Sequence, residues 1–297
     1  MYPAPFQYYR PESLQEAIGL LTKLGDEAKV IAGGQTLLPM LKMRLGDMSY
    51  LIDIGRLPDL SYIEQRGDTI HIGALATHAD IANSDAAKVI PLLKDCGGGI
   101  ADKQVRNRGT IGGGLSVADP SGDWPTGLRV LDTLIVCTGP NGTRNVDLKD
   151  FIIDSYTADL RDGELVTEVQ IKVPPANSGG AYVAFKRAAP AYPTSTVAVQ
   201  LTMNGDNCDN IRMALGASGS KSIVSEEAEN LLKGQPLTRE NLTKAAEVIV
   251  AASKPPADAR GSEEFKRAML RSLVVESAER AVARARGEEI KGGHRYA

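Results

Sequence analysis

The sequence predicts an α+β fold, with two α/β subdomains followed by a C-terminal domain of antiparallel strands and helices. Three observations indicate this. Short apolar runs alternate with helical segments as far as residue 175, three strand-like runs then follow one another, and only helical patterns remain after residue 224. We therefore expect α/β subdomains at 1–55 and 56–175, a three-stranded antiparallel sheet with a helical bundle at 176–287, and a tail at 288–297.

The first subdomain opens with a helix over "PESLQEAIGLLTKLG". Ser13 and Glu16 have the spacing of a capping box, and Gly25 fits the C-terminal stop. The runs 28–32 and 50–54 have the apolar character of short buried strands. Between them "TLLPMLKMRL" has helical spacing, and its proline requires the helix to start late or to kink.

The second subdomain alternates in the same way. Residues 68–73 predict a strand, 77–99 two helices separated by a break, and 123–139 a helix that runs into a strand. "GPNGTRNV" indicates a turn between strands. The alternating run "ELVTEVQIKVPP" predicts a further strand and ends at a double proline, which suits a domain boundary.

The C-terminal part changes character. "GAYVAFKR", "STVAVQLTM" and "NIRMALGA" predict three strands, and "NGDNCD" between the last two is typical of an antiparallel hairpin. Helices are predicted over 224–233, 238–252 and 262–286.

The composition narrows the possible functions. A net charge of −3 gives no basic surface for nucleic acid, and no apolar run approaches the roughly 20 residues of a membrane span. The N-terminus lacks a signal-peptide pattern, so we expect a cytoplasmic protein. Three dispersed cysteines and three dispersed histidines predict neither a disulfide framework nor a metal site. No catalytic side-chain set is apparent, so any enzymatic chemistry would come from a bound cofactor.

Two glycine-rich segments, "AGGQT" and "TIGGG", each follow an apolar run. Glycines let backbone N–H groups approach a phosphate, and two such segments could serve the two halves of a pyrophosphate. Neither matches the Rossmann or Walker pattern, and each alone is more typical of a tight turn. Asp123 could accept a hydrogen bond from a cofactor hydroxyl, or could instead cap the following helix. The candidate residues are Ala32, Gly33, Gly34, Gln35, Thr36, Thr110, Ile111, Gly112, Gly113, Gly114 and Asp123.

Together, "IAGGQTLLPMLKMRL" and "TIGGGLSVADPSGD" resemble the paired motifs AGG-x-[ST]-L and TIGGN-x(5)-P-x(2)-D of the molybdenum hydroxylase flavoprotein family. This family comprises the medium, FAD-binding subunits of carbon monoxide, nicotine and xanthine dehydrogenase-type complexes. The resemblance covers nearly the whole chain, including "FQYYRPESLQEAIGLL" and "AYVAFKRAAPAYPTSTVAV". It implies an FAD-binding fold, in which non-covalent FAD lies between the first two subdomains and its ring reaches toward the third.

The resemblance also assigns residue roles. The two glycine segments would bind the pyrophosphate through backbone N–H groups, and Asp123 would hold a cofactor hydroxyl. Lys186 and Tyr192 would lie beside the flavin ring, and Val166 would touch it from the middle subdomain. The sequence departs from the family pattern at three positions, and it does not predict how they affect the flavin potential. Gly114 replaces the usual Asn, Gln35 stands where some relatives have His, and Trp124 replaces an aliphatic residue.

The resemblance implies an electron-transfer subunit with no metal of its own. Electrons would arrive from the [2Fe-2S] clusters of a small partner subunit and leave to an external acceptor. A large partner subunit would carry molybdopterin, and the complex would be a dimer of heterotrimers. Its substrate could be carbon monoxide, nicotine, a purine or another N-heterocycle. Two alternatives remain open: a self-contained FAD-dependent reductase or oxidase of the same fold, and a flavin-free binding module whose glycines serve only turns.

Overall fold

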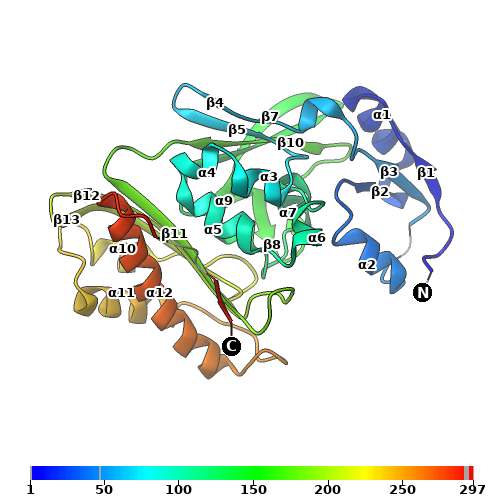
Figure 1. Cartoon of the computed structure of the whole chain (residues 1–297). Coiled ribbons are helices and arrows are strands. Elements are labelled where there is room, and N and C mark those ends of the chain that lie inside the picture. The colour runs from blue at the N-terminus through cyan, green and yellow to red at the C-terminus, as the bar shows by residue number, and fades with distance from the viewer. Residues whose placement is uncertain (1, 47, 291–293, 297) are drawn as a thin grey trace.

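The computed structural model describes residues 2–46, 48–290 and 294–296. Its three main sheets have three, five and four strands, and a two-stranded ribbon accompanies the second. In Figure 1 the N-terminal sheet lies at one end of the molecule and the C-terminal sheet at the other, with the middle sheet and its helices between them. The predicted α+β class is confirmed. No helix in the described ranges has both the length and the apolar character needed to cross a membrane.

The N-terminal sheet is parallel, in the order β1-β3-β2. Its elements are β1 (Gln7–Tyr9), α1 (Leu14–Leu24), a 3₁₀ turn (Gly25–Glu27), β2 (Ala28–Ile31), α2 (Leu37–Lys42) and β3 (Tyr50–Asp53). The Ser13 hydroxyl accepts the Glu16 N–H at 3.2 Å, which is one half of the predicted capping box, whereas the Glu16 carboxylate accepts the Glu12 N–H at 2.7 Å and not that of Ser13. α1 ends at Gly25 with φ 58°. α2 begins two residues before Pro39, so the proline occupies the first turn, where its missing N–H costs no helical bond. β1 was not predicted, because it is short and largely exposed.

The five-stranded sheet is antiparallel throughout, in the order β4-β5-β10-β6-β7. Its strands are β4 (Ile63–Arg66), β5 (Thr69–Gly73), β6 (Thr133–Gly139), β7 (Gly142–Asp147) and β10 (Leu165–Lys172). The accompanying ribbon is β8 (Ile152–Asp154) and β9 (Thr157–Ala158), and a 3₁₀ turn (Pro58–Leu60) precedes β4. Of these strands, β4, β8 and β9 were not predicted. Three of the four side chains of β4 are exposed and polar, and β8 and β9 are only three and two residues long.

The described part of the middle subdomain also contains seven short helices. They are α3 (His78–Asn83), α4 (Ala86–Val89), α5 (Pro91–Gly99), α6 (Lys103–Arg106), α7 (Ile111–Val117), α8 (Asp123–Leu128) and α9 (Leu148–Phe151). The prediction of two helices over 77–99 was wrong, because the chain forms three. Pro91 lacks the N–H that would continue α4 and instead opens α5.

The C-terminal sheet has the order β13-β12-β11-β14. The three predicted antiparallel strands are present as β11 (Ser178–Lys186), β12 (Ser195–Asn204) and β13 (Asn207–Gly216). The segment predicted as a tail adds the short parallel strand β14 (His294–Tyr296) beside β11. The helices are α10 (Glu226–Asn230), α11 (Arg239–Ala251) and α12 (Glu263–Ala285), and Figure 1 shows α11 and α12 running along one face of the sheet.

The two faces of the C-terminal sheet belong to different cores. Alternate side chains face the helices of the same domain, including Ala181, Val183, Val197 and Val199. Those on the opposite face join the core of the middle subdomain, including Tyr182, Ala184, Ala198 and Ala214. This period-two alternation joins the two domains through a shared apolar interface.

A buried ion pair crosses the same interface. The Arg284 guanidinium of α12 donates to both carboxylate oxygens of Asp95 in α5, at 2.9 Å for Nη2–Oδ1, and also to the carbonyl of Gly180 at 2.7 Å. Asp95 further accepts the Tyr182 N–H at 3.2 Å. The Asp95 side chain is only 2% exposed and that of Arg284 8%, so the buried guanidinium depends on Asp95 for compensation of its charge.

Candidate cofactor-binding site

The first glycine segment forms a loop of unpaired donors between β2 and α2. Across the described chain, the backbone N–H groups of residues 33–36 donate no hydrogen bond. Gly34 has φ 75°, which favours glycine, and the Gln35 side chain turns back to donate to the Gly33 carbonyl at 3.1 Å. Consecutive free N–H groups of this kind can cradle an anion.

The second glycine segment differs from the predicted loop. Thr110 is the N-cap of α7, and Gly112, Gly113 and Gly114 form the first turn of that helix. The N–H groups of residues 111–114 already have acceptors: Ile111 to Ala76 O, Gly112 to Ala74 O, Gly113 to Thr110 Oγ1, and Gly114 to Thr110 O. A Cβ on Gly112 would lie 2.6 Å from the Cβ of Ala74, so this glycine permits close packing of the helix. The segment therefore lacks the free donors that the first loop has.

The two segments meet through Gly33. A Cβ on this residue would overlap the carbonyl oxygen of Arg108 and lie 2.6 Å from its carbonyl carbon and 2.9 Å from the Cα of Gly109. The N-terminal loop can therefore approach the turn before Thr110 only because residue 33 has no side chain. This contact brings the two predicted motifs, almost eighty residues apart in sequence, to one place.

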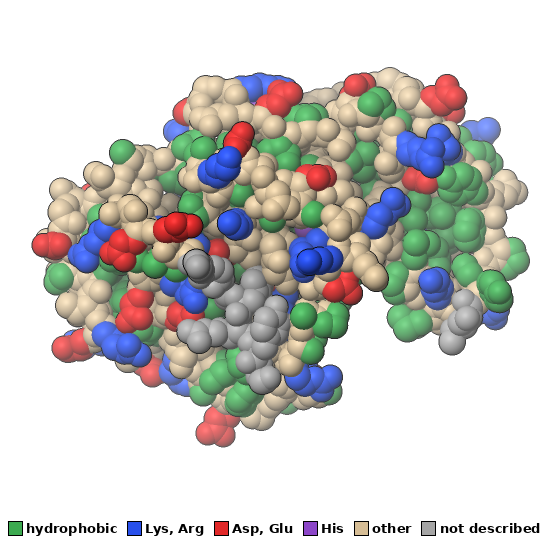
Figure 2. Space-filling view, viewed as in Figure 1, with side chains coloured by type: hydrophobic (Ala, Val, Ile, Leu, Met, Phe, Trp, Pro, Cys, Tyr) green, Lys and Arg blue, Asp and Glu red, His purple; other side chains and the backbone are tan. Residues whose placement is uncertain are grey.

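A cavity of about 230 Å³ opens beside this contact. The predicted residues that line it are Gln35, Thr36, Gly114, Asp123, Lys186 and Tyr192. The predicted residues that lie outside its lining are Ala32, Gly33, Gly34, Thr110, Ile111, Gly112, Gly113 and Val166. The Val166 side chain is buried in the middle core, and the residue pairs with Cys137 of β6, so its contact with a flavin ring stays a prediction. Figure 2 shows the surface indented between the N-terminal subdomain and the C-terminal domain, with Lys and Arg side chains along the border.

The Asp123 carboxylate lines the cavity and interacts with Tyr182 and Lys186. Asp123 is the first residue of α8, whereas Gly122 is the N-cap, so the alternative of a capping side chain was wrong. The Tyr182 hydroxyl donates to Asp123 Oδ1 at 2.8 Å, and Lys186 Nζ lies 3.7 Å from the same oxygen. Asp123 is 7% exposed and Lys186 1%, and the ammonium also donates to Gly99 O at 2.8 Å. The described contacts of this carboxylate all use Oδ1, which leaves Oδ2 as an acceptor.

His78 and Trp124 also line the cavity, and sequence reasoning did not assign them to it. The indole Nε1–H of Trp124 donates to His78 Nδ1 at 3.0 Å. Burial lowers the pKa of His78 to about 4, an effect that Asp123 opposes and Arg106 reinforces. The histidine is therefore neutral at physiological pH. The two partners lie 46 positions apart, so no local pattern could reveal the pair.

The low pKa of His78 makes stability depend on pH. As pH falls, His78 in the unfolded chain binds a proton near the ordinary histidine pKa of 6.5. In the folded chain the same imidazole binds a proton only near pH 4. This contribution to the free energy of unfolding is complete above pH 6.5 and is lost between that value and pH 4. It amounts to about 3 kcal/mol. Urea unfolding measures the free energy of unfolding at pH 7 and at pH 4. Between these two values the wild-type apoprotein should lose about 3 kcal/mol more of this free energy than the His78→Gln variant does. Equal losses would contradict the assignment of a buried neutral histidine.

Two of the departures from the family pattern are neighbours in space. A Cβ on Gly114 would lie 3.4 Å from Cδ1 of Trp124 and 4.0 Å from Cε1 of His78. A longer side chain at position 114 would compete with the indole for this space. Gly114 and Trp124 therefore form one packing arrangement.

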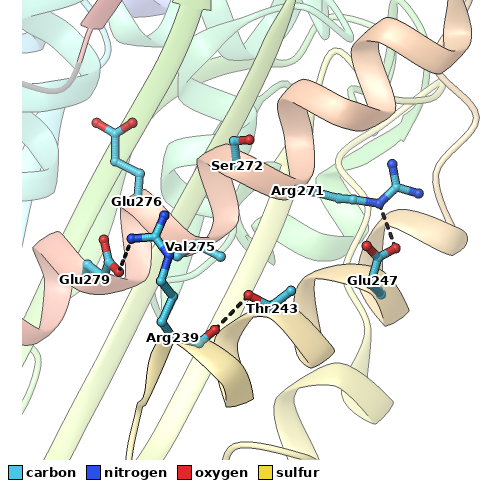
Figure 3. Close-up of a pocket in the computed structure, with 8 residues that line it drawn as sticks. All are labelled: Arg239, Thr243, Glu247, Arg271, Ser272, Val275, Glu276 and Glu279. Carbon is cyan, nitrogen blue, oxygen red and sulfur yellow. Dashed lines mark hydrogen bonds and ion pairs between the residues drawn. The ribbon is translucent and has the colours of Figure 1, made fainter.

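A second hollow, of about 510 Å³, lies between α11 and α12 (Figure 3). Its charged side chains pair with one another: Arg239 Nη1 lies 3.5 Å from Glu279, and Arg271 Nε lies 2.6 Å from Glu247. It is larger than the first cavity, yet it is lined by helix side chains and contains none of the predicted site residues. We therefore assign it to the solvated helical surface. No group of three or more His, Cys, Asp or Glu side chains in the described residues is arranged to hold a metal ion.

Comparison with known proteins agrees with this arrangement. Residues 4–175 match the family model for the FAD binding domain in molybdopterin dehydrogenase, and residues 180–281 match that for the CO dehydrogenase flavoprotein C-terminal domain. The carbon monoxide dehydrogenase medium chain of Afipia carboxidovorans is 37% identical over 96% of this chain and 100% of its own length. The glyceraldehyde dehydrogenase medium chain of Sulfolobus acidocaldarius is 35% identical over 93% of this chain and 98% of its own.

Solved structures give the same result. A crystal structure of Cu,Mo-CO dehydrogenase superimposes with a TM-score of 0.92 at 36% identity, covering 96% of this chain and 100% of the other. Quinoline 2-oxidoreductase from Pseudomonas putida 86 gives a TM-score of 0.91 at 30% identity, covering 96% and 99%. The matches extend over the glycine loop, the cavity and the C-terminal sheet. The chain therefore belongs to the molybdenum hydroxylase flavoprotein family, as an FAD-binding medium subunit of a molybdopterin-dependent oxidoreductase.

Proposed function

We propose that this chain transfers electrons within a molybdenum hydroxylase complex, from the [2Fe-2S] clusters of a small subunit to an external acceptor. A large subunit would hold molybdopterin and the organic substrate, and the assembly would be a dimer of heterotrimers. The observation that carries the proposal is the loop of unpaired N–H groups at residues 33–36, beside a cavity that also contains Asp123 and Lys186. Cytoplasmic location stays a prediction.

The donor set suits an anionic dinucleotide. The N–H groups of the first loop would hold the pyrophosphate, and Gln35 and Thr36 of that loop line the cavity. The second segment, Thr110–Gly114, would contact the cofactor by packing of its helix turn, since the N–H groups of residues 111–114 are already bonded. Redox chemistry at the site would be supplied by FAD, which can exchange electrons singly or in pairs.

The remaining cavity residues would orient the cofactor. Asp123 Oδ2 would accept a hydrogen bond from a ribityl or ribose hydroxyl, with the carboxylate fixed by Tyr182 and charge-balanced by Lys186. Lys186 and Tyr192 line the wall contributed by β11 and the loop after it, and would lie beside the flavin ring. These side chains orient the cofactor and exclude water, and none of them has to act on the organic substrate.

The substrate would be selected by the large subunit. Relatives of this chain are named for carbon monoxide, glyceraldehyde, nicotine and xanthine, although each is similar in sequence to more than nine-tenths of this chain. The variety of substrates among relatives with similar medium chains supports the proposal that the flavin subunit does not select the substrate.

The proposal is tested by purifying the tagged chain from its native cells and analysing the eluate for flavin, molybdenum and iron. We expect the three to co-elute, and we expect the dissociated FAD-loaded chain to oxidise no NADPH. A flavoprotein that elutes alone and oxidises NADPH would support the self-contained reductase instead. A colourless protein without these partners would support the binding module.

A further inference from the structure

His78 lines the cavity, but none of the cofactor contacts proposed above involves it. It is the first residue of α3 and only 6% exposed, yet it lies on the cavity wall. Its ring lies between two glycine positions: a Cβ on Gly109 would approach Nε2 to 2.6 Å, and one on Gly114 would lie 4.0 Å from Cε1. The imidazole therefore lies against the segment that carries the second glycine motif.

The partner of Nδ1 fixes the tautomer. An indole Nε1–H can only donate, so the bond from Trp124 requires an unprotonated Nδ1 on His78. In a neutral imidazole the single hydrogen must then reside on Nε2. The indole is itself buried at the start of α8, so it holds the ring in one orientation.

The other ring nitrogen is an unused donor. Within the described chain, Nε2–H donates to no protein acceptor, and the residue lines the cavity. The first loop, with its free N–H groups, supplies Gln35 and Thr36 to the same cavity. The loop and the imidazole therefore border one cavity, which is where an anionic oxygen of the cofactor would lie.

We propose that His78 binds the cofactor directly, its Nε2–H donating a hydrogen bond to a pyrophosphate oxygen of FAD. Trp124 acts as a positioning residue, because its indole selects the tautomer that can donate. This inference rests on the proposed FAD site. It adds a neutral donor to the backbone donors of the first loop.

Two substitutions separate this role from a merely structural one. The amide of Asn can take the place of Nδ1 and accept from Trp124, whereas the longer Gln can place its amide N–H near Nε2. If His78 binds FAD, His78→Gln should retain affinity and His78→Asn should lose it. If His78 only anchors Trp124, the Asn variant should behave as wild type and the Gln variant should be impaired.

The measurement is FAD titration of the apoprotein by quenching of flavin fluorescence, alongside thermal unfolding. We expect His78→Asn to raise the Kd for FAD about tenfold to hundredfold, the loss of one hydrogen bond to a charged group. His78→Gln should stay within about threefold of wild type. Trp124→Phe should weaken FAD binding less than His78→Asn does. Without the indole N–H, the imidazole of His78 can adopt either tautomer, and one of the two still donates from Nε2.

Unchanged affinity in His78→Asn, or equal losses in both variants, would overturn the proposal. A wild-type apoprotein that binds no FAD would instead refute the FAD site itself. If a variant fails to fold, the wild-type chain still provides a test, since it contains three histidines and can be labelled with ¹⁵N-histidine. FAD addition should slow the exchange of one imidazole Nε2–H with solvent, and an exchange rate that FAD leaves unchanged would contradict the bond.

Discussion

Gly33→Ala is expected to weaken FAD binding by about tenfold to a hundredfold, the cost of forcing one methyl group into a closely packed site. The added Cβ would overlap the carbonyl oxygen of Arg108, so the N-terminal loop would have to withdraw from the turn before Thr110. That withdrawal would separate the loop's N–H donors from the rest of the cavity. Fluorescence titration of the apoprotein with FAD measures the effect.

Gly19→Ala is the matched control in the same subdomain. Gly19 lies within α1, has no left-handed φ, and has no atom within 4 Å of the position that a Cβ would take. The added methyl should leave FAD affinity unchanged and should stabilise the helix by about 0.5–1 kcal/mol. Wild-type affinity in Gly33→Ala would mean that contact between the two segments is not needed for cofactor binding.

Asp95→Asn is expected to lower the free energy of unfolding by about 3–5 kcal/mol, because it leaves the Arg284 guanidinium buried without its counter-charge. The pair joins α5 of the middle subdomain to α12 of the C-terminal domain, and both partners are almost fully buried. Urea unfolding at pH 7 should show a lower midpoint. The FAD-loaded protein should lose flavin at lower urea concentration, because Lys186 of the cavity belongs to the C-terminal domain.

The double variant Asp95→Leu with Arg284→Met is the control for a buried charge. Replacing both partners by apolar side chains removes the uncompensated guanidinium, so much of the lost stability should return. Full recovery is not expected, because the Tyr182 N–H and the Gly180 carbonyl would also lose a partner. If Asp95→Asn alone has the same free energy of unfolding as wild type, the ion pair contributes nothing to the stability of the interface.

The elements that the sequence predicted well are those determined by local contacts. α1 has its own cap at Ser13 and its own stop at Gly25, and the C-terminal strands alternate because each face meets a different core. By contrast, β1, β4 and β14 are only three or four residues long. β1 and β14 form by pairing with strands that are distant in sequence, and β4 forms a hairpin with the neighbouring β5 although three of its four side chains are exposed. Nothing within such short segments distinguishes them from loops.

The same division holds for the site. The AGGQT loop was identified from its composition, because free N–H groups and a positive φ need glycine at particular positions. Gly112 and Gly113 also need to be small, but for helix packing and capping geometry, which composition alone does not distinguish from ligand binding. The pair of His78 and Trp124 depends on the folding of α3 against α8, so it is evident only in three dimensions.

The central claim is that this cavity and the first glycine loop bind FAD without a covalent link. The most direct test is the visible absorption spectrum of the purified chain, followed by acid release of the chromophore and phosphodiesterase treatment of the supernatant. We predict a flavin spectrum, full release by acid, and a rise in fluorescence after phosphodiesterase, as FAD requires. A colourless protein that also fails to bind added FAD would contradict the account.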